Sequence, residues 1–600
     1  MCGLAGIFAY ADQAPAVDQA ALLRVRDDMR SRGPDGAGLW ISDDRRVGLA
    51  HRRLSIIDLS SSGAQPMTDP ETGNRIVFNG EIYNYQALRA ELTAAGHRFH
   101  SRSDTEVLLK LYAAHGQQML HRLRGMFAFA IWDSRQRALF LARDPFGIKP
   151  LYLADDGKAL RFASQVKALL AGGGIDTSPE AAGHVGFFVL GTVPEPFTLY
   201  QGIRALPAGH SLWLETEGRS RRQSYFGLAE AYAQPAMTAA STRDEACELL
   251  HQAMRDSVRH HLAADVPVGV FLSAGLDSTT VAALAKETGG AQLRTLTLGF
   301  SEFVGADHDE VPLAEAMSKH LGARQHTQWV SRGDFTEHLE RLLVAMDQPS
   351  IDGVNSYFVA KAAHDAGLKA ALSGLGGDEL FAGYDYYRTI PRMVRRLRPF
   401  SLIPGLGSGF RFISAPIIKR FTSPKAAGLR EYGGDYVGAY LLRRGLYMPW
   451  ELPEVLDGEL VRQGWRDLQL LPALRSSIDG VEGEREKISL LDTAWYMRNQ
   501  LLRDTDWASM AHSLEVRVPF VDMELFRVVT GLAREGRAPS KQDMAASPAR
   551  PLPDAVRHRR KTGFAVPTRE WLLDAATDTV IANAGRGLRP WAVYIHSHCA

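Results

Sequence analysis

The chain begins Met1-Cys-Gly-Leu-Ala-Gly-Ile-Phe8, and its apolar run continues to Tyr10. Such a run predicts a buried β-strand that starts a domain. The small residue at position 2 permits removal of Met1, which would leave Cys2 with both a thiol and an α-amine. The amine has a pKa of ~7.7–8, near that of a free thiol, so it can act as the base that activates its own nucleophile. A lone cysteine here is more often only a small residue, so other residues decide its meaning.

Residues 1 to about 165 continue as short strand-like runs separated by turns. Two helices interrupt them, one at 85–95 and one from the capping-box spacing Ser103-Asp-Thr-Glu106 to about 114. Many short strands with few helices predict packed antiparallel sheets in an α+β layered domain. The expected strands are 4–10, 47–58, 76–83, 126–133, 138–143 and 151–154.

The composition bounds the class of protein. The chain has 600 residues, enough for more than one domain, and is 45% hydrophobic and 23% charged. Its net charge of +1 gives no reason to expect nucleic acid or a membrane as a partner. Three cysteines, Cys2, Cys247 and Cys599, argue against a disulfide framework. No apolar run reaches the ~18 residues of a membrane span, and no signal peptide is evident. We therefore expect a cytoplasmic protein.

Polar residues gather where the expected strands of the first domain end. Asn79-Gly80-Glu81 follows the apolar residues 76–78, and a carboxamide beside a backbone N–H is what an oxyanion hole requires. Arg52 and Arg53 could hold a carboxylate, and Glu81 and Asp104 could hold an ammonium, as an α-amino acid substrate needs. Each residue also has a structural interpretation, as an Asn-Gly turn, a surface ion pair or a helix cap.

Five motifs over about a hundred residues together resemble the N-terminal-nucleophile (class II) glutamine amidotransferase domain. The resemblance implies a four-layer αββα fold in a domain spanning about 2–215. It also implies that Cys2 attacks the glutamine carboxamide, that Asn79 and Gly80 hold the oxyanion, and that Arg53, Glu81 and Asp104 bind the glutamine backbone groups. The motifs are Cys2–Phe8, Arg32-Gly-Pro-Asp35, His51-Arg-Arg-Leu-Ser-Ile56, Asn79-Gly-Glu-Ile-Tyr-Asn84 and Ser103-Asp-Thr-Glu106.

The second half of the chain has a different pattern. A capped helix from Thr242 to about 263 is followed by buried strand-like runs at 266–272, 294–300 and 368–372, with helices between them. Alternation of this kind predicts a doubly wound parallel sheet in a domain spanning about 240–600. Ligands of such sheets bind at the carboxyl ends of the strands. Residues 388–480 are expected to be helical, as an insertion or subdomain.

Two Gly-containing loops follow strands of this sheet. Ser273-Ala-Gly-Leu-Asp-Ser278 opens a helix, where backbone N–H groups favour phosphate, but it lacks the lysine of a Walker A loop. Asp277 suits a phosphate site only if Mg²⁺ bridges the two. The second loop, Ser373-Gly-Leu-Gly-Gly-Asp-Glu379, would lie on the same rim of the sheet. The shared rim predicts a nucleotide site.

These loops, with residues 510–522 and Arg560-Lys-Thr-Gly-Phe564, resemble the synthetase domain of glutamine-hydrolysing asparagine synthetases, which has an ATP pyrophosphatase-type fold. The resemblance implies that ATP activates a carboxylate as an acyl-adenylate, with Lys561 stabilising the developing charge, and that ammonia then displaces AMP. Asp277 and Asp378 would hold Mg²⁺, with Asp309 a further candidate, and no tightly bound organic cofactor is expected. The ATP and pyrophosphate site would comprise Leu272, Ser273, Gly275, Asp277, Ser278, Leu298, Ser373 and Gly374.

Two residues depart from the family pattern. Ala274 stands where the family usually has glycine, and alanine has less freedom at positive φ. Leu375 stands where members that act on aspartate usually carry an acidic residue. Either Asp378 or Glu379 substitutes for it, or the acceptor differs. Aspartate is therefore the expected acceptor, with another carboxylate, on a sugar acid or a peptide, as the alternative.

The two expected sites must exchange ammonia, which water would protonate to an inert ammonium ion. A dry passage between the domains would prevent this, with Arg32 and residues 126–129 as lining by resemblance; an ordinary buried strand is the other interpretation of 126–129. The expected partners are thus glutamine, ATP and a carboxylate acceptor. The resemblance also suggests a homodimer.

Overall fold

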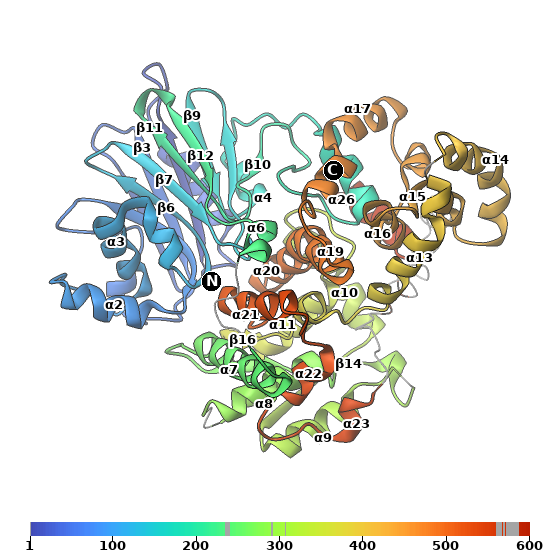
Figure 1. Ribbon diagram of the computed structural model, residues 1–600. Coiled ribbons are helices and arrows are strands. Elements are labelled where there is room, and N and C mark those ends of the chain that lie inside the picture. The colour runs from blue at the N-terminus through green and yellow to red at the C-terminus, as the bar shows by residue number, and fades with distance from the viewer. Residues whose placement is uncertain are drawn as a thin grey trace.

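The computed structural model describes residues 2–234, 240–289, 292–306, 308–401, 403–559, 567, 571 and 587–599. Two antiparallel sheets make up the N-terminal part, and a parallel sheet with many helices makes up the C-terminal part (Figure 1). The predicted two-part architecture is confirmed.

The N-terminal sheets have six strands each, all paired antiparallel. The first sheet has the order β10 (Arg204–Ala205), β8 (Tyr152–Asp155), β9 (Ala159–Ala163), β1 (Gly3–Ala9), β3 (Val47–Arg53) and β2 (Gly36–Ile41). The second has the order β12 (Ser220–Ser224), β11 (His210–Glu215), β7 (Ala138–Arg143), β6 (Gly125–Asp133), β5 (Arg75–Ile82) and β4 (Met67–Thr68). Because β12 is an edge strand of the second sheet, this sheet extends past residue 215.

Helices cover the outer faces of both sheets. Helices α1 (Gln19–Asp28) and α4 (Val166–Gly172) share a buried cluster with β1 and β9. Helices α2 (Tyr85–Ala94) and α3 (Asp104–His115) share another with β5, β6 and β7. A third cluster, which includes Phe8 and Val77, lies between the sheets. The order helix, sheet, sheet, helix is the expected αββα arrangement.

The C-terminal sheet is parallel throughout, with the order β15 (Arg324–Val330), β14 (Arg294–Phe300), β13 (Val268–Phe271), β16 (Ala370–Leu372) and β17 (Glu515–Arg517). The three central strands fall within the predicted apolar runs. Edge strand β15 was not predicted, because half-exposed polar residues fill its Arg-Gln-His-Thr-Gln sequence. Strand β17 was not predicted because it has only three residues and lies about 140 positions after its neighbour.

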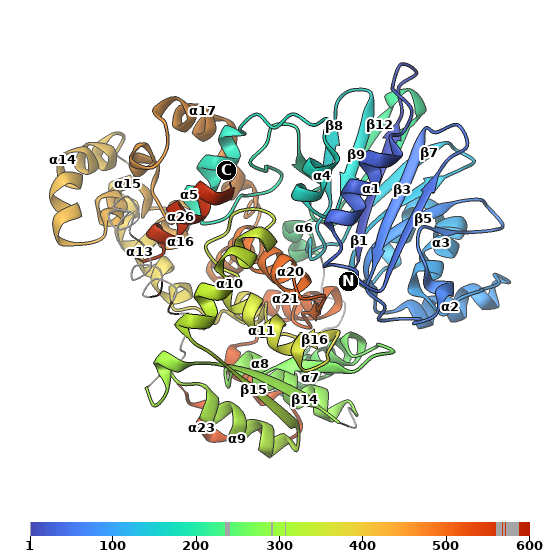
Figure 2. The ribbon, with the colours of Figure 1, turned by 180° about the vertical axis from the view of Figure 1, so that it is seen from behind.

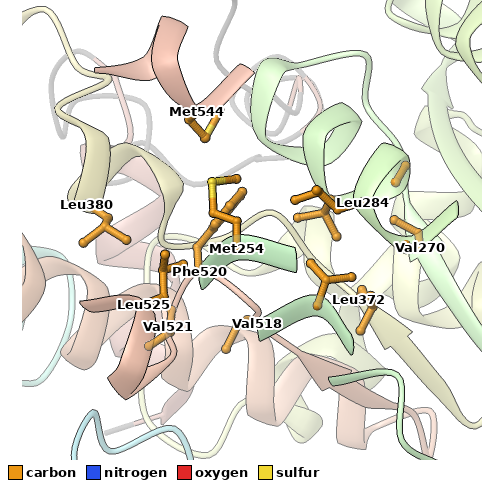
Figure 3. Packing of buried hydrophobic residues seen from close by; sticks show 14 of the residues in the cluster. Met254, Val270, Leu284, Leu372, Leu380, Val518, Phe520, Val521, Leu525 and Met544 are labelled. Atoms are coloured by element: carbon orange, nitrogen blue, oxygen red, sulfur yellow. The ribbon is translucent and has the colours of Figure 1, made fainter. Parts of the chain in front are cut away.

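Apolar side chains from several helices fix the loops at the carboxyl ends of these strands. Figure 3 shows Val270 of β13 and Leu372 of β16 packed with Leu284 of α8 and Met254 of α7, and Met544 of α22 nearby. Around the sheet lie α7 (Arg243–His261), α8 (Leu276–Glu287), α9 (Val311–Leu321), α10 (Arg332–Ala345), α11 (Val354–Asp365), α12 (Gly377–Phe381), α20 (Arg503–Met510), α21 (Met523–Arg534), α22 (Lys541–Ala546) and α23 (Asp554–Arg557).

The expected helical region between the second loop and β17 is confirmed. It holds α13 (Tyr386–Ser401), α14 (Leu406–Phe421), α15 (Leu429–Tyr432), α16 (Tyr436–Arg444), α17 (Gly458–Leu468), α18 (Leu470–Ser476), α19 (Glu484–Leu491) and a π-helix (Asp492–Leu502) (Figure 2). Helix α5 (Ala181–Leu190) packs against α17, α26 (Arg589–Cys599) contacts α10, and α6 (Leu228–Ala233) contacts α21. Short 3-10 turns occur at Ser61–Gly63, Gly116–Arg122, Thr216–Gly218, Ser301–Phe303, Pro424–Gly428 and Pro449–Glu454.

Within the described ranges, no single helix has the length and apolar content needed to cross a membrane. One bent pair, α13 with residues 406–418 of α14, reaches that length and composition together across a 108° bend.

Candidate active sites

Cys2 lies directly before β1, buried against the strand ends of the first sheet. Its backbone N–H donates to Asn79 Oδ1 at 3.0 Å, and its Sγ lies 3.9 Å from the Leu54 carbonyl. Arg32 Nε donates to the Cys2 carbonyl at 3.1 Å. Burial raises the pKa of the Cys2 thiol, although the nearby positive charge of the chain terminus opposes the rise. A buried thiol of this kind needs an adjacent base to become a thiolate.

The Asn79-Gly80 pair is held on β5 where that strand faces β6. Asn79 Nδ2 is fully buried and has no hydrogen-bond partner among the described residues, so it is available to a ligand. Gly80 has φ +153°, and a Cβ there would lie 2.0 Å from the Met126 carbonyl oxygen of β6. Only glycine fits this position. The sequence signal Asn-Gly therefore marks a special strand position rather than a turn.

Glu81 and Asp104, the two residues predicted to bind an ammonium, lie in one buried group of charges. Asp104 Oδ2 accepts the Ile82 N–H at 3.0 Å, and burial raises the pKa of Asp104 to about 6. Glu81 Oε2 is buried with no hydrogen-bond partner in the described structure. Burial and then the charge of Glu515 raise the pKa of Glu81. Carboxyl groups crowded in this way favour an incoming cation.

The sequence did not indicate that the C-terminal part contributes to this group. Arg517 of β17 is fully buried, and its Nη2 lies 3.5 Å from Glu81 Oε1. The same guanidinium donates to Glu515 at 2.6 Å and to the His261 carbonyl at 2.8 Å. Residues 515 and 517 were noted only as part of a family motif. The first site is thus completed across the domain boundary.

Arg53, predicted to bind a carboxylate, holds the loop that follows it. Its guanidinium donates to the carbonyl oxygens of Ser60, at 2.7 Å, and of Asp58, and so holds the loop after β3. These bonds involve Nη1 and Nη2 of Arg53, and its expected role in binding a carboxylate stays a prediction. The loop it holds contacts the C-terminal part, since Asp265 accepts the Asp58 N–H at 2.8 Å.

The second site is a cavity of about 680 Å³ at the carboxyl ends of β13, β14 and β16. It brings together every residue predicted for ATP and pyrophosphate. These are Leu272, Ser273, Gly275, Asp277, Ser278, Leu298, Ser373 and Gly374. Asp378 also lines it. The carboxyl ends of parallel strands lie on one rim of a sheet. This rule predicted that two loops a hundred residues apart in the sequence would line one site.

The two loops approach each other so closely that their small residues are required. A Cβ on Gly374 would lie 2.7 Å from the Ser278 backbone nitrogen. Ser278 Oγ accepts the Ser273 N–H at 3.2 Å, which closes the first loop over the start of α8. Ala274 has φ 55°, so the departure from glycine noted in the sequence falls on a left-handed position. Helix α8 begins at residue 276, two positions earlier than predicted, which places Asp277 in its first turn.

Lys541 of α22 is the main residue of this cavity that sequence analysis missed. Its Nζ contacts Asp277 Oδ1 and lies 2.9 Å from Asp378 Oδ1. Burial alone would lower the pKa of Lys541, but the two carboxylates outweigh it and raise the pKa. The pair Asp277 and Asp378 supplies hard oxygen ligands facing a phosphate loop, which suits Mg²⁺ shared with substrate phosphates. The described residues contain no denser group of metal ligands.

The cavity is lined by the carboxylates of two aspartates besides Asp277 and Asp378. Asp352 and Asp504 line it together with Leu375 and Tyr496. Burial, followed by the charge of Asp352, raises the pKa of Asp504 to about 7. Glu379, considered as a substitute for an acidic residue at 375, does not line the cavity.

The sequence also predicted three other residues for this site: Glu379, Asp309 and Lys561. Glu379 instead accepts the Tyr384 hydroxyl at 2.7 Å. Asp309 also lies off the cavity wall and accepts the Gly305 and Val311 N–H groups of its own loop. Lys561, predicted to stabilise the adenylate, lies outside the described residues.

Arg32 joins the two sites physically. Besides contacting Cys2, it makes a buried bidentate ion pair with Asp506 of α20, at 2.7 and 3.1 Å. Helix α20 also carries Asp504 of the second cavity. Of residues 126–129, only Met126 belongs to the apolar cluster shared by the two parts of the chain; Phe127 and Phe129 face α2 and α3, and Ala128 lies between the sheets.

A buried N-terminal thiol on an αββα layer, joined to a phosphate-loop cavity on a parallel sheet, defines an amidotransferase coupled to a nucleotide-dependent synthetase. Comparison with known proteins agrees. Residues 1–226 match the family model of the glutamine amidotransferase domain, and residues 249–588 match that of asparagine synthase. The chain belongs to the family of glutamine-hydrolysing asparagine synthetases. It is an ATP-dependent carbon–nitrogen ligase that takes nitrogen from glutamine.

Relatives match over nearly the whole chain. Asparagine synthetase [glutamine-hydrolyzing] 1 of Bacillus subtilis is 34% identical, covering 97% of this chain and 89% of the relative. A putative asparagine synthetase of Mycobacterium tuberculosis H37Rv is 35% identical, covering 95% and 88%. The amidase chry2 of Gibberella zeae is 33% identical, covering 65% and 60%. The relatives thus carry different names.

Proposed function

We propose that this chain is a glutamine-dependent asparagine synthetase that amidates the side-chain carboxylate of aspartate. The observation that supports the chemistry is the cavity lined by both loops, because a nucleotide and an acceptor carboxylate bound in it would be within reach of each other. The family supports aspartate as the acceptor.

At the first site, Cys2 attacks the carboxamide carbon of glutamine. Removal of Met1 would make the Cys2 nitrogen an α-amine, which takes the thiol proton, and ammonia leaves as the thioester forms. Asn79 Nδ2 and the Gly80 N–H stabilise the oxyanion. Asp104 and Glu81 hold the α-ammonium of glutamine. Water then hydrolyses the thioester to glutamate.

At the second site, the acceptor carboxylate attacks the α-phosphorus of ATP, giving an acyl-adenylate and pyrophosphate. Ser273, Ser278 and the first N–H groups of α8 bind phosphate oxygens. Asp277 and Asp378 would hold Mg²⁺, which neutralises phosphate charge when bound. Lys541 keeps these two carboxylates together. Ammonia from the first site attacks the acyl carbon, and AMP leaves with the bonding electrons of the acyl–phosphate bond.

We propose that ammonia passes between the sites without entering bulk water. Arg32 and Met126 lie on the boundary that it must cross. Turnover of ¹⁵N-amide glutamine in excess unlabelled ammonium tests the passage. We expect the amide product to retain most of the label, and full dilution of the label would contradict a closed route.

A second candidate is amidation of a different carboxylate by the same chemistry. Leu375 favours it, because this side chain lines the cavity and provides neither a proton nor a charge. The relative named as an amidase shows that members of similar sequence carry other names.

Pyrophosphate release from ATP separates the two candidates. We expect release to depend on aspartate and to be stimulated little by sugar acids or peptides with free carboxylates. If aspartate elicits none while glutamine is still hydrolysed, the acceptor is another carboxylate. Cys2→Ala should lower the rate of glutamine-driven amidation by about a thousandfold or more and leave ammonia-driven amidation unchanged. Cys247→Ala, at an exposed cysteine, is the control.

A further inference from the structure

Helices α13 and α14 form a surface that the proposed reaction does not use. From residue 386 to residue 430 the sequence contains ten Lys and Arg residues and no Asp or Glu. The whole chain, by contrast, has 69 basic and 68 acidic residues. The balanced net charge, which predicted no anionic partner, therefore hides a local positive segment. We call residues 386–421 the α13–α14 surface.

The apolar side chains of α14 are exposed in a helical stripe. Leu406, Ile413, Ile417 and Phe421 follow each other at spacings of seven, four and four, which places them on one face. Phe412 beside them is 82% exposed and Phe421 is 81% exposed. Phe400 and Ile403 continue the exposed apolar set into the bend between the helices. Isolated exposed residues need no explanation, but a contiguous stripe marks a contact surface.

Other residues of α14 hold the helix against α15 and its neighbours. Arg411 Nε donates to Glu431 Oε2 at 2.5 Å, and the Arg430 guanidinium lies 4.1 Å from the centre of the Phe410 ring. Gly407 lies against the backbone of α15, where a Cβ would approach Glu431 to 2.6 Å. These contacts hold the helix in place, while the four residues of the stripe remain exposed.

The exposed basic residues adjoin this stripe. They lie on α13, which meets α14 at the bend, and comprise Arg388, Arg392, Arg395, Arg396 and Arg398. Figures 1 and 2 both place α14 at the edge of the molecule, on the side away from the N-terminal sheets. A flat surface could therefore reach α14 without meeting the amidotransferase part.

We propose that the α13–α14 surface binds an anionic lipid bilayer, with the Phe and Ile side chains of α14 inserted at the headgroup level. A helix with an apolar stripe and only positive charges is the pattern of interfacial amphipathic helices. Clusters of four to eight Lys and Arg on such a helix favour anionic lipid. Neither helix spans the bilayer in this arrangement, since each is too short. A nucleic acid would pair with the arginines but would leave the isoleucines and phenylalanines uncovered.

Sedimentation of the full chain with vesicles tests the proposal. We expect binding to phosphatidylglycerol-containing vesicles, weakening at high salt, and little binding to pure phosphatidylcholine. Replacing Phe412, Ile413 and Phe421 with serine should lower the apparent affinity roughly tenfold or more. Replacing Arg388, Arg392 and Arg396 with glutamine should lower it on the order of a hundredfold. All six side chains are exposed, so these variants should fold normally.

Val344→Ser on α10 is the matched control, because Val344 is an isolated apolar side chain that is 68% exposed. This variant should bind vesicles as the parent does, and glutamine hydrolysis without vesicles should be unchanged in every variant. Loss of vesicle binding in the control, or full binding by the serine variant, would overturn the proposal. So would binding to heparin without binding to vesicles. A concentration-dependent dimer that the serine variant abolishes, without vesicle binding, would show instead that the surface joins two copies of the chain.

Discussion

Arg32 and Asp506 form a buried bidentate ion pair, at 2.7 and 3.1 Å, between the amidotransferase and synthetase parts of the chain. Neither side chain is more than 4% exposed. Nε of the same guanidinium donates to the backbone carbonyl of Cys2, the proposed nucleophile. The pair therefore connects the position of Cys2 to the position of α20.

Asp506→Asn should uncouple the two parts. It leaves the Arg32 charge buried without a counter-charge, which costs about 3–5 kcal/mol of unfolding free energy. We expect slower glutamine hydrolysis and fewer amide products per glutamine consumed, with ammonia-driven synthesis less affected. Denaturant unfolding and the product-to-glutamate ratio measure these effects. Asp256→Asn, which removes a half-exposed partner of Arg124, is the control and should cost about 1 kcal/mol or less. An unchanged ratio in Asp506→Asn would show that the pair is only structural.

Substitutions of Asn79 distinguish its two contacts. Asn79→Asp keeps an oxygen that accepts the Cys2 N–H but replaces the unpartnered Nδ2 donor. Asn79→Ala removes both. We expect each to lower kcat for glutamine hydrolysis about 10²–10³-fold, since one oxyanion donor is lost in both. Ammonia-driven synthesis should be unaffected. Full hydrolysis by Asn79→Asp would mean that Nδ2 does not hold the oxyanion.

Lys541→Met should act on the second site alone. Without the lysine, the carboxylates of Asp277 and Asp378 repel each other and attract cations more strongly. We expect pyrophosphate release to fall at least roughly tenfold and its dependence on Mg²⁺ concentration to shift, while glutamine hydrolysis is unchanged. Titration of Mg²⁺ against pyrophosphate release measures both. Lys319→Met, an exposed lysine on α9, is the matched control. An unaltered Mg²⁺ dependence would remove Lys541 from the nucleotide site.

The features that sequence predicted are those with local signatures. The apolar runs of β13 and β16, the small loops that follow them and the Asn-Gly position on β5 each depend on neighbouring residues. The parallel-sheet rule then supplied the one long-range step, from two loops to one cavity. Every residue expected to bind the nucleotide does line that one cavity.

The features that sequence missed depend on contacts between distant segments. Lys541 is a single lysine on a six-residue helix, 264 positions from Asp277, and no spacing marks it. Arg517 reaches Glu81 only because β17 is the edge strand beside the first domain. The contacts of Arg53 with the carbonyl oxygens of the loop at 57–60 were likewise not predicted. The charge and type of a residue alone do not determine which distant segment it contacts.

Asp504 should make stability depend on pH in a direction opposite to that of an ordinary carboxylate. Its pKa rises to about 7 in the folded chain, above the ~3.9 of an unfolded aspartate. The stability that the protonated group contributes is complete below the unfolded pKa and is lost as the pH rises through the folded pKa. Between pH 5 and pH 8 the parent should lose about 2–3 kcal/mol relative to Asp504→Asn, whose side chain does not titrate.

Denaturant unfolding of both proteins at several pH values measures this difference. The exposed Asp365→Asn variant should track the parent across the same range. Asp504 accepts hydrogen bonds from Ser350 Oγ at 2.6 Å and from Trp507 Nε1 at 2.9 Å. The amide of Asp504→Asn has only one acceptor oxygen for these two donors. The variant should therefore be less stable than the parent at pH 5. The informative quantity is therefore the change with pH and not the offset. A constant difference in unfolding free energy from pH 5 to pH 8 would show that Asp504 is already ionised at pH 5. Burial in the cavity would then not raise the pKa of Asp504 as expected.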